Sequence, residues 1–473
     1  MGLQRSLGPL DKRKKVKRCQ ACARRRIKVS QETPTSTTEA DRSLKCTGGM
    51  PCEYCTRTHK ECRPQSQLPL AAVFVSQTSE SIAPMDYGTL QVRPMDMDIE
   101  SRCLDCFIMF AGQNQFTSQF QSVGIDLLPV TQRSPSLRYA AIAIGALDAS
   151  RRGSARSHQE EKSLLTIAFN AYSKSINALQ RVLTTGDVAL QDDVLWSTFL
   201  LGLFELISNS SGDGWAKHML YGAGRLLQLA GPNRPVSSLR WRFWELFRGL
   251  EALRAILYGE HTMLSQNIWV TFQQDLSASK SGSWDPMESI LALMIHTSEF
   301  SKRFFDLLGG VSESYRATDG SIDDLGIQGL EIQTAIYEWH TEALGRLADL
   351  DGDSQFQLAL AYYHGLLLFL SSNYRYYPHW DAKPAPVLSQ AEADGHVNAI
   401  LHLAEQILDT SNIPGVMLFF PLRVAGSQAL YAPQRSNILG LLGQVHRKGF
   451  MVSDQIYADL VGLWEYQKSI YHS

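Results

Sequence analysis

The sequence has little of what a membrane-spanning or secreted protein needs. Its longest apolar runs, at 194–203 and 366–370, fall well short of the roughly 18 residues that cross a bilayer. The N-terminus is basic and polar, so no apolar signal peptide is evident. Cysteine is scarce outside residues 19–62, which hold six of the eight cysteines. We therefore expect a soluble protein in a reducing compartment, with no membrane partner.

Sheet patterns, internal repeats and sustained coiled-coil heptads are also missing. No stretch alternates apolar and polar residues as a half-buried strand does. From about residue 101, apolar residues recur instead at three- and four-residue steps, as at Leu165, Phe169 and Tyr172. The pattern predicts a large all-α domain over residues 101–473, which is long enough to bury a sizeable core.

Capping signals indicate where several of these helices begin and end. Ser134-Pro135 is typical of a helix start ahead of Leu137–Ala149, and Asp285-Pro286-Met287-Glu288 is a capping-box start. Gly309-Gly310 is a stop signal for the latter helix. Another helix, around Trp196–Phe204, is expected to end before the turn at 208–214. Further helices are predicted at 327–347, 355–370, 392–408, 436–446 and 454–468.

Charge is distributed unevenly along the chain. Residues 1–64 contain 16 Lys and Arg against 6 Asp and Glu, a net charge of +10. Because the whole chain carries −2, the remainder carries −12. A basic head on an acidic body indicates that the head meets a polyanion.

The six clustered cysteines have the spacing of metal ligands. They form two Cys-x2-Cys pairs, each followed by one further cysteine: Cys19, Cys22, Cys46, Cys52, Cys55 and Cys62. Structural zinc takes four sulfur or nitrogen ligands in a tetrahedron. Six thiolates fill two such sites only if two sulfurs bridge both metals. The stretch therefore predicts a cluster of two Zn2+ ions.

This stretch resembles the binuclear zinc-cluster DNA-binding domain of fungal transcription factors, whose pattern is Cys-x2-Cys-x6-Cys-x5–12-Cys-x2-Cys-x6–8-Cys. The basic run 24–28 and Pro51 before the fourth cysteine match as well. The resemblance implies that Cys19 and Cys52 bridge the metals. Cys22 and Cys46 would then complete one zinc site, and Cys55 and Cys62 the other.

One element departs from the family pattern. Between Cys22 and Cys46 lie 23 residues where the family has 6, and deleting Val29–Lys45 restores the family spacing. These 17 residues correspond to 51 nucleotides, in frame, and their codons can carry the donor, branch and acceptor sequences of a short fungal intron. Our hypothesis is that residues 29–45 are a retained intron, and the alternative is a genuine loop insertion.

The resemblance also implies how DNA is read. Zinc would fix a short helix after Cys22 that carries Arg24, Arg25, Arg26 and Lys28. Such a helix fits the major groove, where Arg25 and Arg26 occupy the positions that contact a CGG triplet in the family. Arg57 and Lys60 are expected to contact phosphates. The preceding arm has the composition of a nuclear import signal or a phosphate contact: Lys12, Arg13, Lys14, Lys15, Lys17 and Arg18.

Residues 63–100 have the composition of a linker, rich in Ser, Gln, Pro and Met. Without heptads there, binding as a monomer and as a homodimer formed through the body both stay open. The body itself resembles the fungus-specific transcription factor domain at Gly214–Pro232, Phe420–Gly426, Arg435 and Trp464. Together the two resemblances predict a nuclear, sequence-specific RNA polymerase II regulator. Its partners would be double-stranded DNA and the transcription machinery, and no catalytic residue is expected.

The sequence also bears on two rival functions. A ubiquitin-ligase-like zinc module without sequence-specific DNA binding needs eight ligands in two crossed sets, more than this stretch supplies. A helical enzyme of the terpene cyclase kind would need a third carboxylate beside Asp192-Asp193 or Asp323-Asp324, which the sequence does not provide one turn on. These acids are better explained as stabilising charges at helix starts.

Two further features have structural explanations. Cys103 and Cys106 form another Cys-x2-Cys, but an apolar run follows and no second pair is near, so they are expected in the core. The aromatic group at 374–380 either lines a ligand pocket or packs a helix end against the core. We expect the latter.

Overall fold

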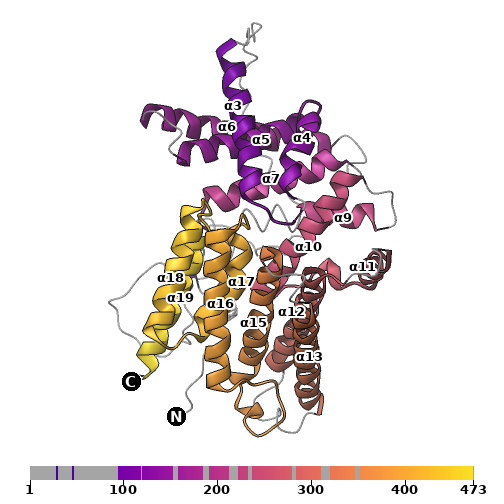
Figure 1. Cartoon of the computed structure of the whole chain (residues 1–473), viewed down its shortest axis with the longest axis vertical. Coiled ribbons are helices and arrows are strands. Elements are labelled where there is room, and N and C mark those ends of the chain that lie inside the picture. Colours follow the sequence, from indigo (N-terminus) through magenta and orange to yellow (C-terminus); the bar gives the residue numbers. More distant parts are fainter. Residues whose placement is uncertain are drawn as a thin grey trace. The chain divides into compact units, whose positions relative to one another are not determined.

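The structure is a computed structural model in which the chain divides into two compact units, residues 1–84 and 85–473. It describes residues 28–29, 45–46, 94–118, 120–152, 158–184, 191–211, 222–232, 237–279, 284–310, 320–346 and 352–471. Within the described part of the second unit every regular element is a helix (Figure 1). The predicted all-α body is therefore confirmed.

The first helices of the second unit pack around α5 (Pro135–Arg151). The Ser134 hydroxyl accepts a hydrogen bond from the Leu137 amide, which confirms the predicted start of this helix. Around α5 lie α3 (Pro94–Gln113), α4 (Val123–Thr131), α6 (His158–Leu183) and α7 (Asp192–Ser208). Short η1 (Phe120–Ser122) joins α3 and α4.

Helix α10 (Ser238–Tyr258) connects these helices to the rest of the domain. It contacts α4 and α7 on one side and α12 and α17 on the other. Its neighbours in sequence are α9 (Gly224–Ala230), η4 (Met263–Ser265) and α11 (Asn267–Ser279). Trp196 on α7 is fully buried, and its indole donates to the Leu239 carbonyl at the start of α10.

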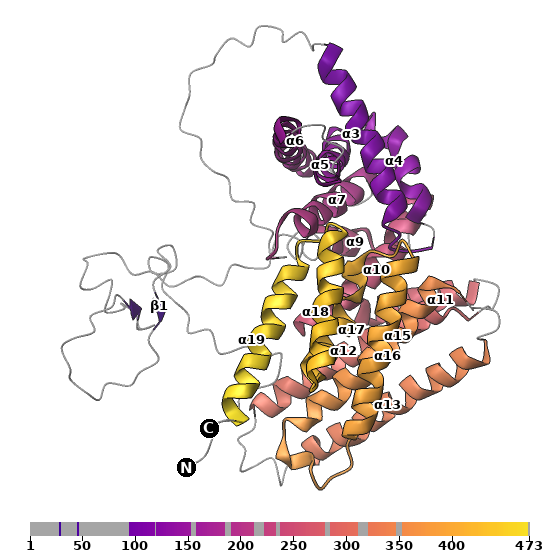
Figure 2. The same ribbon diagram turned by 60° about the vertical axis from the view of Figure 1, so that its left-hand side comes forward.

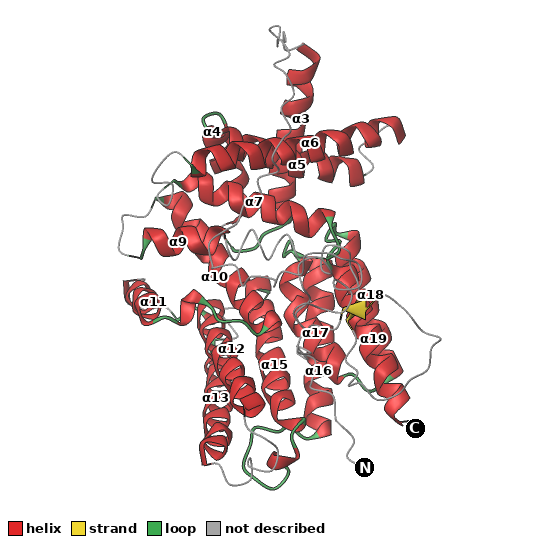
Figure 3. Ribbon diagram, turned by 180° about the vertical axis from the view of Figure 1, so that it is seen from behind, coloured by secondary structure: helices red, strands yellow, loops and turns green. Residues whose placement is uncertain are grey.

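The C-terminal helices form a bundle around α15 (Ser354–Arg375), as Figures 2 and 3 show from two sides. The buried Tyr362 hydroxyl of α15 donates to the Met417 carbonyl at 3.0 Å. Every predicted helix range in this half falls largely within an observed helix. The bundle comprises α12 (Pro286–Gly310), α13 (Gly320–Gly345), α16 (Gln390–Thr410), α17 (Phe419–Gln428), α18 (Ala432–Arg447) and α19 (Ser453–Tyr471), with η5 (Pro378–Trp380) and η6 (Gly415–Leu418) between them.

The start of α3 differs from the expected linker boundary at residue 100. The helix begins at Pro94, inside the stretch 63–100. Proline at a first helical position loses nothing, because the amide hydrogen it lacks has no partner within the helix. A proline taken as a linker signal is therefore a helix start here.

The first unit contributes two short paired strands, β1 (Lys28–Val29) and β2 (Lys45–Cys46). They are parallel, with Lys28 opposite Lys45 and Val29 opposite Cys46. Paired strands lie about 4.8 Å apart. The two ends of the 17-residue segment 29–45 therefore lie side by side.

The strand pairing overturns one expectation. Lys28 was predicted on the DNA-reading helix, and it lies in β1 instead. The segment that follows Lys28 supplies the reason, because its last residue returns to pair with Lys28.

Candidate functional site

The residues predicted to bind zinc and DNA belong to the first unit. Of them, the structure describes only Lys28 and Cys46, which lie in β1 and β2. The others lie outside the described residues: Cys19, Cys22, Cys52, Cys55, Cys62, Arg24, Arg25, Arg26, Arg57, Lys60 and the arm at 12–18.

Cys103 and Cys106 lie where α3 crosses α5. Cys103 is buried, and burial together with the nearby Cys106 raises the pKa of its thiol to about 11. Its carbonyl lies so close to α5 that a β-carbon on Gly145 would come within 1.8 Å of it. A thiol of such high pKa is a poor metal ligand, because metals bind the thiolate. The core assignment of Cys103 is confirmed, while Cys106 is half-buried.

The paired acids are at helix starts, as expected, but they also bind partners from other elements. Asp192 in the first turn of α7 accepts from Arg240 Nε at 2.9 Å and from the Ser237 hydroxyl. Asp323 in the first turn of α13 contacts Lys383 and His379. In the part of the chain that the structure describes, no group of three His, Cys, Asp or Glu is placed to hold a metal ion.

The aromatic group at 374–380 packs against the core, as predicted. Tyr374, Tyr377 and Trp380 are all at most 8% exposed and surround Phe304 of α12. The Tyr374 hydroxyl donates to the Leu325 carbonyl at 2.6 Å, which fixes the C-terminal end of α15 on α13.

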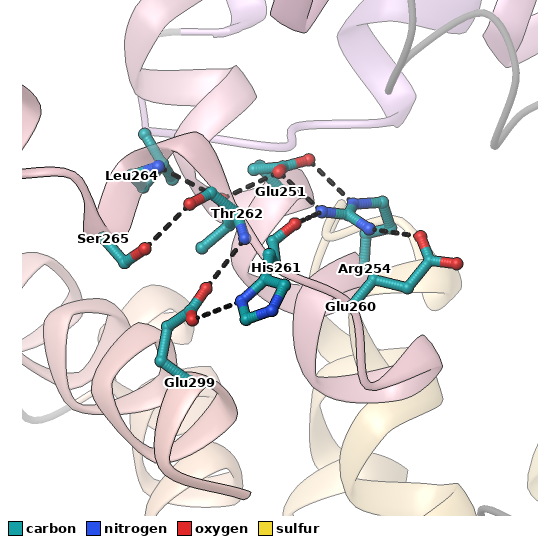
Figure 4. A network of polar contacts seen from close by, with 8 residues as sticks. All are labelled: Glu251, Arg254, Glu260, His261, Thr262, Leu264, Ser265 and Glu299. Carbon is teal, nitrogen blue, oxygen red and sulfur yellow. Dashed lines mark hydrogen bonds and ion pairs between the residues drawn. The ribbon is translucent and has the colours of Figure 1, made fainter. Parts of the chain in front are cut away.

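A buried ion pair that the sequence analysis did not identify lies at the end of α10 (Figure 4). Arg254 donates to both carboxylate oxygens of Glu251, through Nε at 2.9 Å and Nη2 at 2.8 Å. Both side chains are 6% exposed. Arg254 also donates to the Glu260 carboxylate and the His261 carbonyl. The only signal in the sequence is a pair of opposite charges one turn apart, in a helix that carries several other charged residues.

The ion pair continues as a polar network into α12. Gly259, in the left-handed conformation at φ 59°, ends α10 and turns the chain back so that Thr262 reaches Glu251. The Thr262 hydroxyl donates to Glu251 at 2.8 Å, and its amide donates to Glu299 of α12 at 2.9 Å. His261 Nδ1 lies 2.8 Å from the same Glu299 carboxylate. Glu299 thus joins the buried pair to the surface of α12.

A pocket of about 480 Å3 opens beside Glu299. Its residues come from α12 and from the chain just after α10: His261, His296, Glu299, Phe300, Arg303, Asp306 and Leu307. Burial lowers the pKa of His296, and the nearby Arg303 lowers it further. The pocket therefore combines apolar surface from Leu307 with nitrogen donors, and two of its lining residues, His261 and Glu299, belong to the network of Figure 4.

A second group of histidines joins α13, α15 and α16. Nδ1 of His364 lies 2.8 Å from Nδ1 of His396, and the His340 ring stacks on Tyr363 with ring centres 4.2 Å apart. Burial, followed by the charges of His396 and His340, lowers the pKa of His364 to about 3. The pKa of His396 and that of His340 are lowered as well, chiefly by burial.

Residues of the C-terminal motif, far apart in sequence, converge on one site. The Trp464 indole of α19 donates to the Gly426 carbonyl of α17 at 2.8 Å. The Arg435 guanidinium of α18 lies over the Trp464 ring, 5.1 Å from its centre, and donates to the Ala429 carbonyl. Three helices are thereby fixed by residues that the sequence analysis selected as one signature.

Residues 108–464 match the fungal specific transcription factor domain. The chain belongs to this family. The match covers α4 to α18 completely, with the C-terminal end of α3 and most of α19, so the polar network, the pocket and the site at Gly426, Arg435 and Trp464 all lie inside the fungal specific transcription factor domain. The chain is accordingly a transcription regulator of fungal type, and its family is defined by regulation and not by catalysis.

Similarity to individual proteins is limited. The uncharacterized protein AN5342 of Emericella nidulans is 25% identical over 120 residues. The aligned part is 25% of this chain and 26% of that protein, about a quarter of either. No solved structure matches the chain. None of the helices in the described ranges has the length and apolar character that a bilayer crossing requires.

Proposed function

We propose that the chain is a sequence-specific, DNA-binding regulator of RNA polymerase II transcription that acts in the nucleus. The observation that carries the proposal is that one chain contains both a fungal specific transcription factor domain at 108–464 and six cysteines that match zinc-cluster spacing except between Cys22 and Cys46. Residues 19–62 would hold two Zn2+ ions and residues 12–18 would supply import and phosphate contacts. Its partners would be double-stranded DNA and the transcription machinery, with the chain acting as a monomer or a homodimer.

Zinc would supply structure and no chemistry. The six thiolates, with Cys19 and Cys52 shared between the ions, would fix the backbone after Cys22 as a helix. Arg25 and Arg26 on that helix would donate paired hydrogen bonds to guanine O6 and N7 in a CGG triplet. Arg57 and Lys60 would bind phosphates, which adds affinity without sequence choice.

The segment 29–45 is compatible with this cluster. Lengthening the Cys22–Cys46 loop from 6 to 23 residues costs roughly 1 kcal/mol of closure entropy. Structural zinc contributes on the order of 10 kcal/mol to folding. The pairing of Lys28 with Lys45 supports the proposal further, because Cys46 then lies beside the end of the basic run despite the added residues.

The same pairing is compatible with either origin of residues 29–45, the retained intron of our hypothesis or a genuine loop insertion. Removing a segment whose two ends are adjacent requires little rearrangement of the chain on either side. Sequencing the transcript tests this directly. We expect spliced messages that lack the 17 codons, and a uniform population that contains them would establish a genuine insertion.

The proposed function is tested with purified protein in two forms, the full chain and the chain lacking residues 29–45. We expect two zinc ions per chain by elemental analysis. We also expect roughly 10³-fold tighter binding to a CGG-containing duplex than to a scrambled duplex at one salt concentration. Absence of zinc from both forms, or equal affinity for both duplexes, would overturn the proposal. Ubiquitin transfer by the zinc-loaded protein would support a ligase-like module instead.

A further inference from the structure

The pocket beside Glu299 has features of a ligand site that the transcription factor assignment does not explain. Its volume of about 480 Å3 lies within the range of small-molecule pockets. Leu307, which is 37% exposed, contributes apolar surface, and Phe300, only 2% exposed, also lines the pocket. An apolar surface of this kind suits a ring or a short hydrocarbon chain.

The two carboxylates of the pocket already have partners within the protein. Both oxygens of Glu299 are already engaged, one by the Thr262 amide and the other by His261 Nδ1 (Figure 4). Asp306 pairs with Lys302, four residues before it on α12. The two carboxylates that line the pocket are thus bound within the protein.

Arg303 lines the pocket and has no carboxylate partner among the described residues. Its guanidinium lies 5.7 Å from the centre of the Phe300 ring and gives one hydrogen bond, to the neutral side chain of Gln328. Among the described residues Arg303 forms no ion pair. His296 lies two helical turns before Arg303 on α12, lines the same pocket, and makes no hydrogen bond to any described residue.

We propose that this pocket binds a small carboxylic acid with an apolar body. Arg303 would pair with the carboxylate, because a guanidinium presents two parallel donors to a carboxylate. His296 would give a third hydrogen bond, and the exposed Leu307 would contact the apolar part. Glu299 and Asp306 at the same pocket disfavour a dianion such as phosphate.

The position of Glu299 connects this pocket to the buried network. The carboxylate that forms the pocket wall holds the Thr262 amide, and Thr262 in turn donates to Glu251. A ligand bound by Arg303 and His296 would therefore lie beside Glu299, which contacts Thr262 in the turn that follows α10. The site is independent of the zinc cluster, so its occupancy can be tested whether or not the chain binds DNA.

The test uses 4-fluorobenzoate as the probe and 4-fluorobenzamide, of the same shape and without charge, as its control. Binding to the full zinc-loaded chain is followed by fluorine NMR line broadening up to about 20 mM. We expect a millimolar dissociation constant for the benzoate, which is typical of a ligand with about ten heavy atoms. The benzamide and inorganic phosphate are expected to bind at least tenfold more weakly.

Variants locate the binding within the pocket. Arg303→Gln should weaken benzoate binding at least tenfold and His296→Gln about threefold, while Arg447→Gln, an exposed position on α18 that does not line the pocket, should leave it unchanged. Thermal unfolding checks that each variant is folded. If Arg303→Gln does not fold, His296→Gln still tests the pocket. Equal binding of benzoate and benzamide, unchanged binding in both folded pocket variants, or no binding at 20 mM would each overturn the proposal.

Discussion

The indole nitrogen of Trp464 donates a hydrogen bond to the carbonyl of Gly426, and 38 residues of sequence separate the two. Gly426 lies where α17 meets α19, so closely that a β-carbon there would come within 2.6 Å of Leu460. The glycine is therefore required by the distance between two helices. The tryptophan then satisfies a carbonyl in the last turn of α17, for which the helix has no amide partner.

Gly426→Ala is expected to lower the free energy of unfolding by about 1–3 kcal/mol, because an added methyl group overpacks the contact with Leu460. Guanidinium unfolding followed by tryptophan fluorescence measures the change. The matched control is Gly440→Ala in the interior of α18, where no atom lies within 4 Å of the added carbon. There we expect a gain of ~0.5–1 kcal/mol. Equal effects at both positions would refute the close-packing argument.

Glu251→Ala is expected to destabilise the domain by about 3 kcal/mol, because it leaves the Arg254 guanidinium buried with only the half-exposed Glu260 as a carboxylate partner. Replacing both residues with apolar side chains, as Glu251→Leu with Arg254→Met, should cost much less. Glu342→Gln, in an exposed ion pair on α13, should change stability by less than ~0.5 kcal/mol. Chemical unfolding of the four proteins under one condition compares these values. A double variant as unstable as the single one would contradict the burial argument.

Sequence patterns located the helices whose starts are capped and whose buried faces are apolar. Ser134 and Asp285 both cap the helices that follow them, and the Asp285 side chain accepts from the Glu288 amide. Helix α10 was not predicted individually, because Arg240, Arg248 and Arg254 interrupt its apolar pattern. Each of these arginines is less than 10% exposed, with a carboxylate from another helix or from its own. A single sequence shows the charge but not its distant partner.

The candidate sites also differ in whether they could be predicted from the sequence. The Gly426, Arg435 and Trp464 signature could be selected from sequence because these residues resemble a motif of the fungus-specific transcription factor domain. The pocket could not, since His261 and Arg303 come together only through the turn at Gly259. Lys28 was placed on a helix by resemblance, and the added segment 29–45 draws it into a strand pair instead.

Low pH should destabilise the packing of α15 on α16, where His364 meets His396. The folded-state pKa of His364 is about 3 and that of His396 is also lowered, against ordinary values near 6.5, so below about pH 6.5 the unfolded chain binds more protons. Stability from these groups is complete above that pH and is lost as the pH falls toward 3. Glu392 of α16 opposes the shift at His396, whereas His340 of α13 adds to it.

We expect the free energy of unfolding to fall less steeply between about pH 7 and pH 4 in the His364→Gln/His396→Gln double variant than in the wild type. Urea unfolding at a series of pH values measures both slopes. His402→Gln, an exposed position on the same helix α16, is the control and should keep the wild-type slope. Parallel slopes for the wild type and the double variant would show that the pair does not contribute.

Cys52→Ala is expected to abolish both zinc sites, because Cys52 is one of the two thiolates proposed to bridge the metals. Zinc analysis should give fewer than two ions per chain, and the CGG duplex should no longer be preferred over the scrambled one. Cys55→Ala, which removes a ligand from one site only, is the comparison and should do less damage to zinc content. Two zinc ions retained by the Cys52 variant would exclude the bridging assignment.

Arg25→Ala and Arg26→Ala are each expected to weaken binding to the CGG duplex by about 1–3 kcal/mol, because each loses hydrogen bonds to guanine. Binding to scrambled DNA should change far less. Arg57→Ala and Lys60→Ala are the matched controls, since loss of a phosphate contact weakens binding to both duplexes alike and lowers the salt dependence. Fluorescence anisotropy at two salt concentrations separates the two classes. If Arg25 and Arg26 behaved as Arg57 and Lys60 do, the basic run would bind the DNA backbone and the choice of sequence would have to come from other residues of the cluster.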